Sequence, residues 1–600
     1  MNILDYPFDA EQIIKKKKSL RKELLAREDI SYIDKNIAIL GGSTTNVLRN
    51  VLELFLLNYG IRPCFYESEY NMYYEDGMFE NPELEAFHPD IVYIHTSCRN
   101  IAEYPILSDS VEDVNQKLQL TYQKFEGLWN HITETYHCPI IQNNFELPFY
   151  RLMGNREASD FRGGINFVNR LNLMFYEYIN HHENIFIHDI AFEQADYGLR
   201  KWSDPYYWHM YKYMCCVPAI PDSAYNVANI IKSIFGKNKK VLNLDLDNTL
   251  WGGVIGDDGA DNIEIGQETS LGQAFAEFQK YIKQQKDIGV ILTVNSKNEK
   301  SNALEGFERA DSILKRDDFI VFKANWNPKS QNLAETAQEM NLGVDSFVFV
   351  DDNPAEREII RQNFDGIGIA ELDTPEHYIM SIDRGGYFEM THFSVDDIKR
   401  NEMYQANIVR NQTQTNYKEY GEYLKSLEME GEIKPFAAPY MSRISQLTNK
   451  SNQFNLTTKR YTQTQIEEAA GDPMKITLYG KLKDKFGDNG VVSVIIGFKK
   501  EEELHIDLWL MSCRVLKRDM EYAMMDELVN ECIKAGIQHI VGYYYPTKKN
   551  GMVSDFYARQ GFSKLSEDEN GNTVWEYYIT NHYEKKNGVI RVNEDCAAQK

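Results

Sequence analysis

Two aspartates separated by one residue form the most distinctive chemical pattern in the sequence. Asp245 and Asp247 lie in LNLDLDNTLWGG, at the end of an apolar run. At the carboxyl end of a strand in a parallel sheet, such residues lie where these sheets bind ligands. There the first carboxylate can attack phosphorus, and the second can exchange a proton with the leaving group. The pattern therefore points to phosphoryl chemistry.

Three further polar positions extend this pattern. Asp351 and Asp352 end the apolar run of SFVFVDDNP and offer the oxygen ligands that Mg²⁺ prefers. Ser296 ends ILTVNS and can donate a hydrogen bond to a phosphoryl group. Lys329 opens a predicted helix after NWNP and supplies a cation that offsets the charge of carboxylates and phosphate. The alternative is that these are unrelated polar residues at strand ends.

In the order DxDxT, serine, lysine, paired aspartates, the four elements resemble the haloacid dehalogenase (HAD) phosphotransferase superfamily. The resemblance implies that Asp245 forms an aspartyl-phosphate and that Asp247 is the acid and base. It also implies a Mg²⁺ site made by Asp245, the backbone carbonyl of Asp247, and Asp351. Asp352 is a further candidate ligand or a neighbour of the ion. The implied substrate is a small phosphorylated metabolite.

Longer stretches resemble the FkbH-like branch of that superfamily: LDLDNTLWGGVIGDDG, LTVNSKNE, NWNPKSQNL and FVFVDDNPAERE. Some members of this branch move a glyceryl group from an acyl phosphate to the thiol of an acyl carrier protein. The resemblance thus implies synthesis of a polyketide or cell-surface polysaccharide building block, with a carrier protein as a candidate partner. Those transferases have a cysteine just before the motif serine, where this chain has Asn295.

An amide cannot form a thioester, so we rank a Mg²⁺-dependent phosphatase or phosphotransferase first. A glyceryl or acyl transferase that loads a carrier protein or sugar nucleotide is the first alternative. A non-catalytic binding protein with a vestigial HAD site is the second.

The elements that position these residues alternate between strands and helices. Strands are expected at 241–247, 290–296, 319–324 and 346–352, with helices at 273–287, 301–314 and 330–341. Such alternation predicts a doubly wound parallel sheet covered on both faces.

The N-terminal part shows the same alternation and resembles SGNH hydrolases. Ser43, in ILGGSTTN, follows an apolar strand and matches the first block of that family, and Asn143 or Asn144 matches its asparagine block. The nearest counterpart of the aspartate–histidine block, Asp204 and His209, has the wrong spacing. A helix N-cap role for Ser43 and a degenerate scaffold are the alternatives to hydrolysis.

The C-terminal part has adjacent strands followed by a helix and resembles acetyltransferases of the GNAT type. The resemblance implies that Arg514, Asn550 and Tyr557 bind CoA or a phosphopantetheine thioester. Lys517 and Asp519 replace the two glycines with which that family cradles a pyrophosphate. A retained scaffold is the alternative to thioester binding.

We therefore expect a multidomain α/β protein in which a HAD-type sheet is flanked by an SGNH-like α/β domain and a GNAT-like α+β domain. The expected segments are an SGNH-like domain at 1–235, the HAD domain at 236–393, a helical connector at 394–432, the GNAT-like domain at 433–583 and a flexible tail at 584–600.

Composition limits the partners. The 600 residues include 90 acidic and 65 basic side chains, for a net charge of −25, which argues against nucleic acid and anionic membranes as partners. The N-terminus MNILDYPFDAEQ has no secretory pattern, and no apolar run reaches 18 residues. The eight cysteines are scattered without a CxxC pair. A cytoplasmic protein with reduced thiols is expected.

Overall fold

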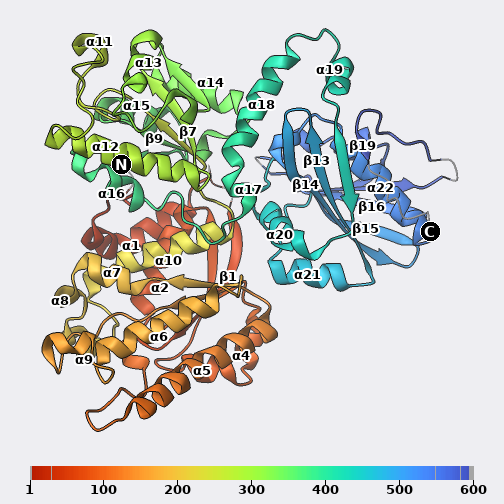
Figure 1. Ribbon diagram of the computed structural model, residues 1–600. Coiled ribbons are helices and arrows are strands. Elements are labelled where there is room, and N and C mark those ends of the chain that lie inside the picture. Colours follow the sequence, from red (N-terminus) through yellow and green to blue (C-terminus); the bar gives the residue numbers. More distant parts are fainter. Residues whose placement is uncertain (1–2, 29, 31, 548, 581–582, 593–600) are drawn as a thin grey trace. The chain divides into compact units, whose positions relative to one another are not determined.

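The computed structural model describes residues 3–28, 30, 32–547, 549–580 and 583–592 (Figure 1). The chain forms two compact units. The first contains residues 1–234 and 389–392, and the second contains 235–388 and 393–600. The described residues hold one sheet in the first unit and two in the second.

The first unit is built on a five-stranded sheet in the order β2-β1-β3-β4-β5, and all its pairs are parallel. One face packs against α5 (Val111–Tyr136) and α6 (Gly164–Ile179), whose apolar side chains form one cluster with those of the strands. Burial on both faces explains why the strands read as continuous apolar runs. The strands are β1 (Ile33–Gly41), β2 (Ile61–Glu67), β3 (Ile91–His95), β4 (Ile140–Asn143) and β5 (Ile185–His188).

A second parallel sheet has the order β10-β9-β6-β7-β8, and the paired aspartates follow two of its strands. Two apolar clusters lie on its opposite faces, which confirms the predicted doubly wound sheet. The strands are β6 (Val241–Leu244), β7 (Ile291–Ser296), β8 (Val321–Ala324), β9 (Phe347–Val350) and β10 (Gly368–Ala370). The helices between them are α12 (Ser270–Asp287), α13 (Lys300–Glu308), α14 (Lys329–Glu339) and α15 (Pro354–Asn363).

Strand β6 has the central position that matters for the site. Leu244 pairs with Val294 of β7 on one side and with Val350 of β9 on the other. Because all three strands are parallel, the residues that follow them lie at the same edge of the sheet. This register brings the aspartates of β6, the serine of β7 and the aspartates of β9 together.

The third sheet has the order β17-β18-β16-β15-β14-β13-β11-β19 and is mostly antiparallel, as predicted for an α+β domain. Helix α22 (Met520–Lys534) contributes buried side chains to its core. The strands are β11 (Glu430–Lys434), β13 (Lys475–Asp484), β14 (Gly487–Lys500), β15 (Glu503–Met511), β16 (His539–Tyr544), β17 (Ser563–Glu567), β18 (Thr573–Tyr578) and β19 (Arg591–Val592).

The connector before this sheet is helical, as expected, with α17 (Val395–Ile398), α18 (Arg400–Gln414) and α19 (Tyr420–Ser426). The expectation of a loose tail from 584 differs from the structure. Ile590 is buried, and β19 pairs in parallel with β11. The apolar residues of GVIRV, at 588–592, explain this packing, whereas 593–600 of the predicted tail lie outside the described residues.

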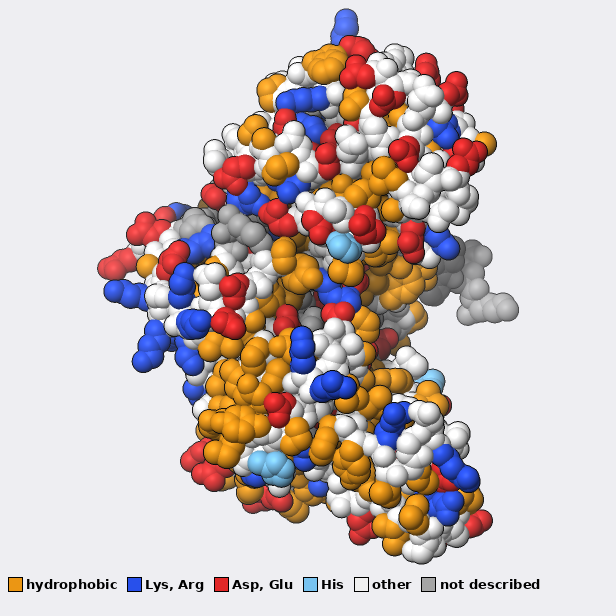
Figure 2. All heavy atoms as spheres, turned by 90° about the vertical axis from the view of Figure 1, so that its left-hand side faces the viewer, with side chains coloured by type: hydrophobic (Ala, Val, Ile, Leu, Met, Phe, Trp, Pro, Cys, Tyr) orange, Lys and Arg blue, Asp and Glu red, His pale blue; other side chains and the backbone are white. Residues whose placement is uncertain are grey.

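The surface is mixed in character. Figure 2 shows acidic and basic side chains interspersed over one face, with many hydrophobic side chains toward its lower part. Exposed apolar residues of the first unit include Phe192 of α7 (Ile190–Tyr197) and Met210 of α9 (Pro205–Tyr211). Over the described residues, none of the helices combines the length and apolar character needed to cross a membrane.

Candidate active site

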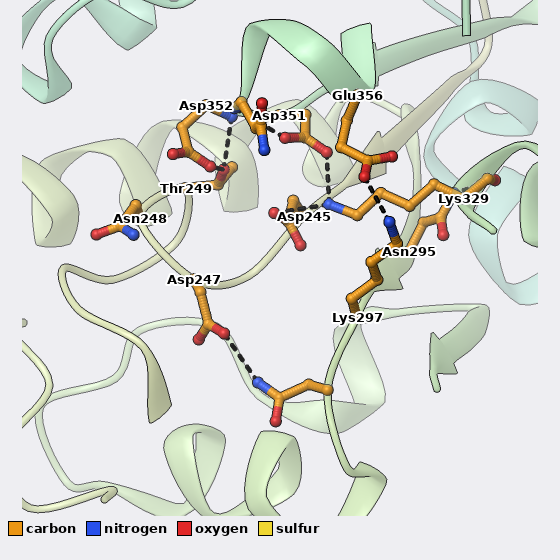
Figure 3. A network of polar contacts seen from close by, with 12 residues as sticks. Asp245, Asp247, Asn248, Thr249, Asn295, Lys297, Lys329, Asp351, Asp352 and Glu356 are labelled. Atoms are coloured by element: carbon orange, nitrogen blue, oxygen red, sulfur yellow. Dashed lines mark hydrogen bonds and ion pairs between the residues drawn. The ribbon is translucent and has the colours of Figure 1, made fainter. Parts of the chain in front are cut away.

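A buried lysine joins the carboxylates at the ends of β6 and β9 (Figure 3). Lys329, at the start of α14, places its Nζ 2.8 Å from Asp245 Oδ2 and 2.5 Å from Asp351 Oδ2. Its side chain is only 4% exposed. Although burial lowers the pKa of Lys329, the charges of Asp245 and Asp351 raise it above its ordinary value. The lysine is therefore held as a cation between the two carboxylates.

Three carboxylates form a cluster with the composition of a metal site. One oxygen each from Asp245, Asp351 and Asp352 lies within 4.8 Å of the others. Thr249 supports the third, since its Oγ1 accepts from the Asp352 amide at 3.2 Å and donates to Asp352 Oδ1 at 3.4 Å. Burial, and then the charge of Asp245, raises the pKa of Asp351. Hard oxygen donors gathered this closely fit Mg²⁺, and a cation would relieve their repulsion.

The carboxylate of Asp247 turns away from this cluster (Figure 3). Its Oδ1 accepts from Trp251 Nε1 at 2.9 Å and from the Ile255 amide at 3.1 Å, and its Oδ2 accepts from Asn298 Nδ2 at 3.0 Å. Burial raises the pKa of Asp247, and the bonds from Ile255 and Trp251 partly oppose this. The structure thus separates this side chain from the three clustered carboxylates.

Ser296 is buried at the end of β7, at the same edge of the sheet. The preceding Asn295 belongs to a buried amide network. Its Nδ2 donates to Asn243 Oδ1 at 3.1 Å and to the Lys329 carbonyl at 2.9 Å, and its Oδ1 accepts from Asn332 at 3.2 Å. The position that holds a cysteine in the glyceryl transferases therefore has a structural role here, fixing the start of α14.

Two residues of this site were missed from the sequence. Asn298 holds Asp247, as described above. Arg357, on α15, donates from Nη1 to the Asp351 carbonyl at 2.7 Å and to the Asp352 carbonyl at 2.8 Å, which fixes the turn after β9. Both residues are polar and buried in the structure. The signal in the sequence was that each lies within six positions of a motif residue.

In the first unit, Ser43 and Asn143 both lie at the carboxyl edge of the sheet. Ser43 is 1% exposed, and its Oγ has no hydrogen-bond partner among the described residues. It is not the cap of α2 (Asn46–Asn58), since the N-cap residue is Thr45. Asn143 Oδ1 bonds to His188 Nδ1 at 2.8 Å, and its Nδ2 lies 3.3 Å from His95 Nδ1. In the described part of the chain, no hydrogen bond joins the serine to the asparagine or to either histidine.

Asn143 thus belongs to a buried polar network. His188 Nε2 lies 2.6 Å from Glu193 Oε1, and Tyr93 Oη lies 2.8 Å from His95 Nδ1. Burial, and then the proximity of His188, lowers the pKa of His95 to about 3. A cavity of about 10 Å³, the size of a single water site, adjoins this network. A cavity of this size does not hold a metabolite in this conformation.

The other candidates in the first unit do not join this network. Asn144 donates to Tyr176 Oη at 2.8 Å and to Asp189 Oδ1 at 2.6 Å. Asp204 caps the short helix α9 by accepting from the Tyr206 amide, and His209 is exposed on that helix. As their spacing in the sequence indicates, Asp204 and His209 do not form an aspartate–histidine block. Histidines at the ends of β3 and β5 lie beside the asparagine instead.

In the third sheet and its loops, two of the three candidate thioester-binding residues, Arg514 and Asn550, bond within the chain. Arg514 bonds to Ser512 Oγ at 3.2 Å and contacts Met403 of the connector. Asn550 Nδ2 donates to the carbonyls of Asn455 and Tyr545. Tyr557 is 1% exposed, its hydroxyl has no partner among the described residues, and burial raises its pKa.

A short strand also fills the place where an extended ligand would add to this sheet. Strands β15 and β16 pair at only three positions and then separate. The chain's own β12 (Phe454–Asn455) pairs with β15 beyond that point. Leu456 then donates to the Trp509 carbonyl at 3.1 Å and accepts from the Tyr545 amide at 2.8 Å.

The loop before α22 is equally occupied. Lys517 and Asp519 adopt φ of 64° and 60°, values that favour glycine, and the Lys517 carbonyl accepts from Tyr420 of α19. Arg518 turns inward to Asp484 at 3.1 Å. In this conformation Lys517 and Arg518 thus bond within the chain.

Comparisons with known proteins bear on the FkbH-like resemblance. Residues 36–232 match the family model of the FkbH N-terminal domain, which confirms the FkbH-like resemblance over that part of the chain. The N-terminal part of the protein BF1531 from Bacteroides fragilis, which contains a phosphatase domain and was solved as a complex with Mg, is 29% identical. That match covers 63% of this chain and 99% of the other, with a TM-score of 0.57.

Two further solved structures each match 25% of this chain. Ard1 from Thermoplasma volcanium is 18% identical, with 99% of that chain covered and a TM-score of 0.21. The PaiA N-acetyltransferase from Thermoplasma acidophilum, in complex with coenzyme A, is 14% identical, with 99% covered and a TM-score of 0.20. No curated protein sequence matches this chain.

Proposed function

We propose, from the match to the FkbH N-terminal domain and the likeness to a phosphatase domain solved with Mg, that this protein is a HAD-type phosphatase or phosphotransferase. Its substrate is a small phosphorylated metabolite. The observation that carries the proposal is the Lys329 ammonium between the Asp245 and Asp351 carboxylates, at the edge where three oxygen donors gather.

In the first step, a carboxylate oxygen of Asp245 attacks the phosphorus of the donor. The bond from phosphorus to the leaving group breaks, an aspartyl-phosphate forms, and Asp247 supplies a proton where the leaving group needs one. Lys329 offsets the negative charge, and Ser296 donates a hydrogen bond to a phosphoryl oxygen.

In the second step, Asp247 takes a proton from the attacking water. The bond from phosphorus to Asp245 breaks, which releases phosphate and restores the carboxylate. An alcohol in place of water would make the same site a phosphotransferase. When Mg²⁺ is held by Asp245, Asp351 and Asp352, it supplies Lewis-acid stabilisation of phosphoryl charge.

The test is phosphate release from a panel of acyl phosphates, sugar phosphates and other phosphorylated metabolites with Mg²⁺ present. Asp245→Asn is expected to lower release by about a thousandfold or more, since an amide is a poor nucleophile. Asp365→Asn, an exposed residue of the same unit, is the matched control and should keep the wild-type rate. Equal release from wild type and Asp245→Asn would refute the aspartyl-phosphate route.

A further inference from the structure

We infer that Asn298 is a positioning residue for the proton-exchanging carboxylate, and that Oδ2 is the oxygen of Asp247 that exchanges the proton. The inference rests on the proposed phosphoryl chemistry and specifies which atoms perform it. The geometry of the donors around Asp247 supports it.

The two oxygens of Asp247 have unequal surroundings. Oδ1 accepts two hydrogen bonds, from Trp251 Nε1 at 2.9 Å and from the Ile255 amide at 3.1 Å. A carboxylate oxygen has about two lone-pair sites, so Oδ1 is fully engaged. Oδ2 accepts one bond, from Asn298 Nδ2 at 3.0 Å, and keeps a site for a proton.

Asn298 is suited to orient this oxygen. It is only 3% exposed and follows Ser296 by two residues, in the loop between β7 and α13. The two donors to Oδ1, Trp251 and Ile255, lie on the same segment after β6 as Asp247 itself. Asn298 alone among these three donors ties Asp247 to the loop of the motif serine, so it fixes the carboxylate relative to the phosphoryl position.

The consequence is specific to one bond-breaking event. When the leaving group is an alcohol, its oxygen must gain a proton as the bond from phosphorus breaks, and Asp247 Oδ2 supplies it. When the leaving group is a carboxylate, as in an acyl phosphate, it departs as a stable anion and needs no proton. Loss of Asn298 therefore impairs the first kind of donor more than the second.

The experiment compares wild type, Asn298→Ala and Asn298→Asp on an alcohol phosphate ester and on acetyl phosphate. Single-turnover release of the leaving group is measured, because it reports the first step alone. We expect both variants to slow release from the ester by about tenfold or more. Release from acetyl phosphate should change by less than about threefold, with KM and Mg²⁺ binding kept. Asn302→Ala is the control from the neighbouring helix.

Asn298→Asp preserves shape but replaces the neutral donor with a carboxylate that repels Asp247, so slowing of the ester reaction in both variants shows that the effect is not one of lost packing alone. Equal slowing of release from the ester and from acetyl phosphate would indicate a structural role for Asn298 and overturn the inference. Wild-type rates in both variants would also overturn it. Release that survives in Asp245→Asn would instead overturn the proposed function. The two failures are therefore distinguishable.

Discussion

Asp351 and Asp352 follow one another in the chain, yet their surroundings differ. Asp351 is completely buried and paired with Lys329, whereas Asp352 is partly exposed and held by Thr249. A buried ligand with fixed geometry contributes more to metal affinity than a mobile one. We predict that Asp351→Asn weakens Mg²⁺ binding by about tenfold or more and Asp352→Asn by a few-fold, as measured by calorimetric titration. The reverse order would show that burial does not set the contribution of each ligand, and unchanged Mg²⁺ binding in both variants would show that the cluster is not the metal site.

Asn295 allows a second prediction about single residues. In Asn295→Cys, the carbonyl of Lys329 and the amide of Asn332 lose a buried partner, at a cost of about 1–3 kcal/mol. We expect a lower unfolding temperature and no covalent acyl adduct after incubation with an acyl phosphate, because side chains at this position point into the core. Asn295→Ala is the matched control. An adduct seen by intact mass only in the cysteine variant would favour the acyl-transfer alternative.

The central residues of the site were predictable for a simple reason. Asp245, Lys329 and Asp351 follow apolar runs or open a helix, and parallel strands bring such positions to one edge whatever the details of packing. Asn298 and Arg357 were not predictable, because their roles depend on where a side chain points after a loop. That direction is set by contacts between segments that are distant in the chain, and local sequence patterns do not reveal such contacts.

At the scale of the elements, the position of β12 leads to a prediction about ligand binding at the third sheet. The strand occupies the gap between β15 and β16, and the loop before α22 is covered by α19. We predict no saturable binding of CoA or acetyl-CoA at millimolar concentration, measured by calorimetry on the full chain. In hydrogen exchange, the amides of Leu456 and Tyr545 should be protected both with and without CoA. Saturable binding together with loss of that protection would show that β12 is displaceable.

The strand ends of the first unit predict a dependence of stability on pH. His95 is buried near Tyr93, Asn143 and His188, with Glu193 beyond, and burial lowers its pKa to about 3 against about 6.5 unfolded. As pH falls, the unfolded chain therefore binds a proton at this histidine before the folded chain does. The contribution of neutral His95 to the free energy of unfolding is complete above pH 6.5 and is lost progressively below it. At pH 5 the loss is about 2 kcal/mol.

The measurement is the difference in unfolding temperature between wild type and His95→Gln from pH 8 to pH 5. The variant is expected to lose less stability on acidification. The buried Glu146, whose pKa burial raises to about 7, has the opposite dependence but is common to both proteins and cancels. Parallel curves would contradict a neutral buried His95.

Long elements were easier to predict than short ones. β7 and β9 are continuous apolar runs, which are typical of strands buried on both faces. Their alternation with helices then predicts a parallel sheet. β12 and β19 are two residues each, too short for a period to be visible, and both exist because a neighbouring strand offers an unpaired edge. The pairing of β12 with β15 therefore had no signal in the sequence.

At the scale of the whole molecule, the connector and the third sheet are joined by a buried charged cluster within the second unit. Asp484, at the end of β13, is ion-paired with Arg410 of α18 at 2.7 Å and with Arg518 at 3.1 Å. Arg518 also bonds to Asn407 of α18. Burial lowers the pKa of Arg518 to about 10, with the charge of Arg410 adding to this effect. One carboxylate thus compensates two buried cations that come from different elements.

Replacing this carboxylate is expected to lower the free energy of unfolding without changing the rate of phosphate release. Asp484→Asn leaves two buried guanidinium groups without an opposite charge, which costs about 3–5 kcal/mol. The exposed Asp488→Asn on the same hairpin should shift the unfolding temperature little. Because Lys329, Asp245 and Asp351 do not contact this cluster, phosphate release per folded molecule should stay at the wild-type rate at 20 °C. A rate that falls with Asp484→Asn but not with Asp488→Asn would show instead that the connector transmits the state of the third sheet to the phosphoryl site.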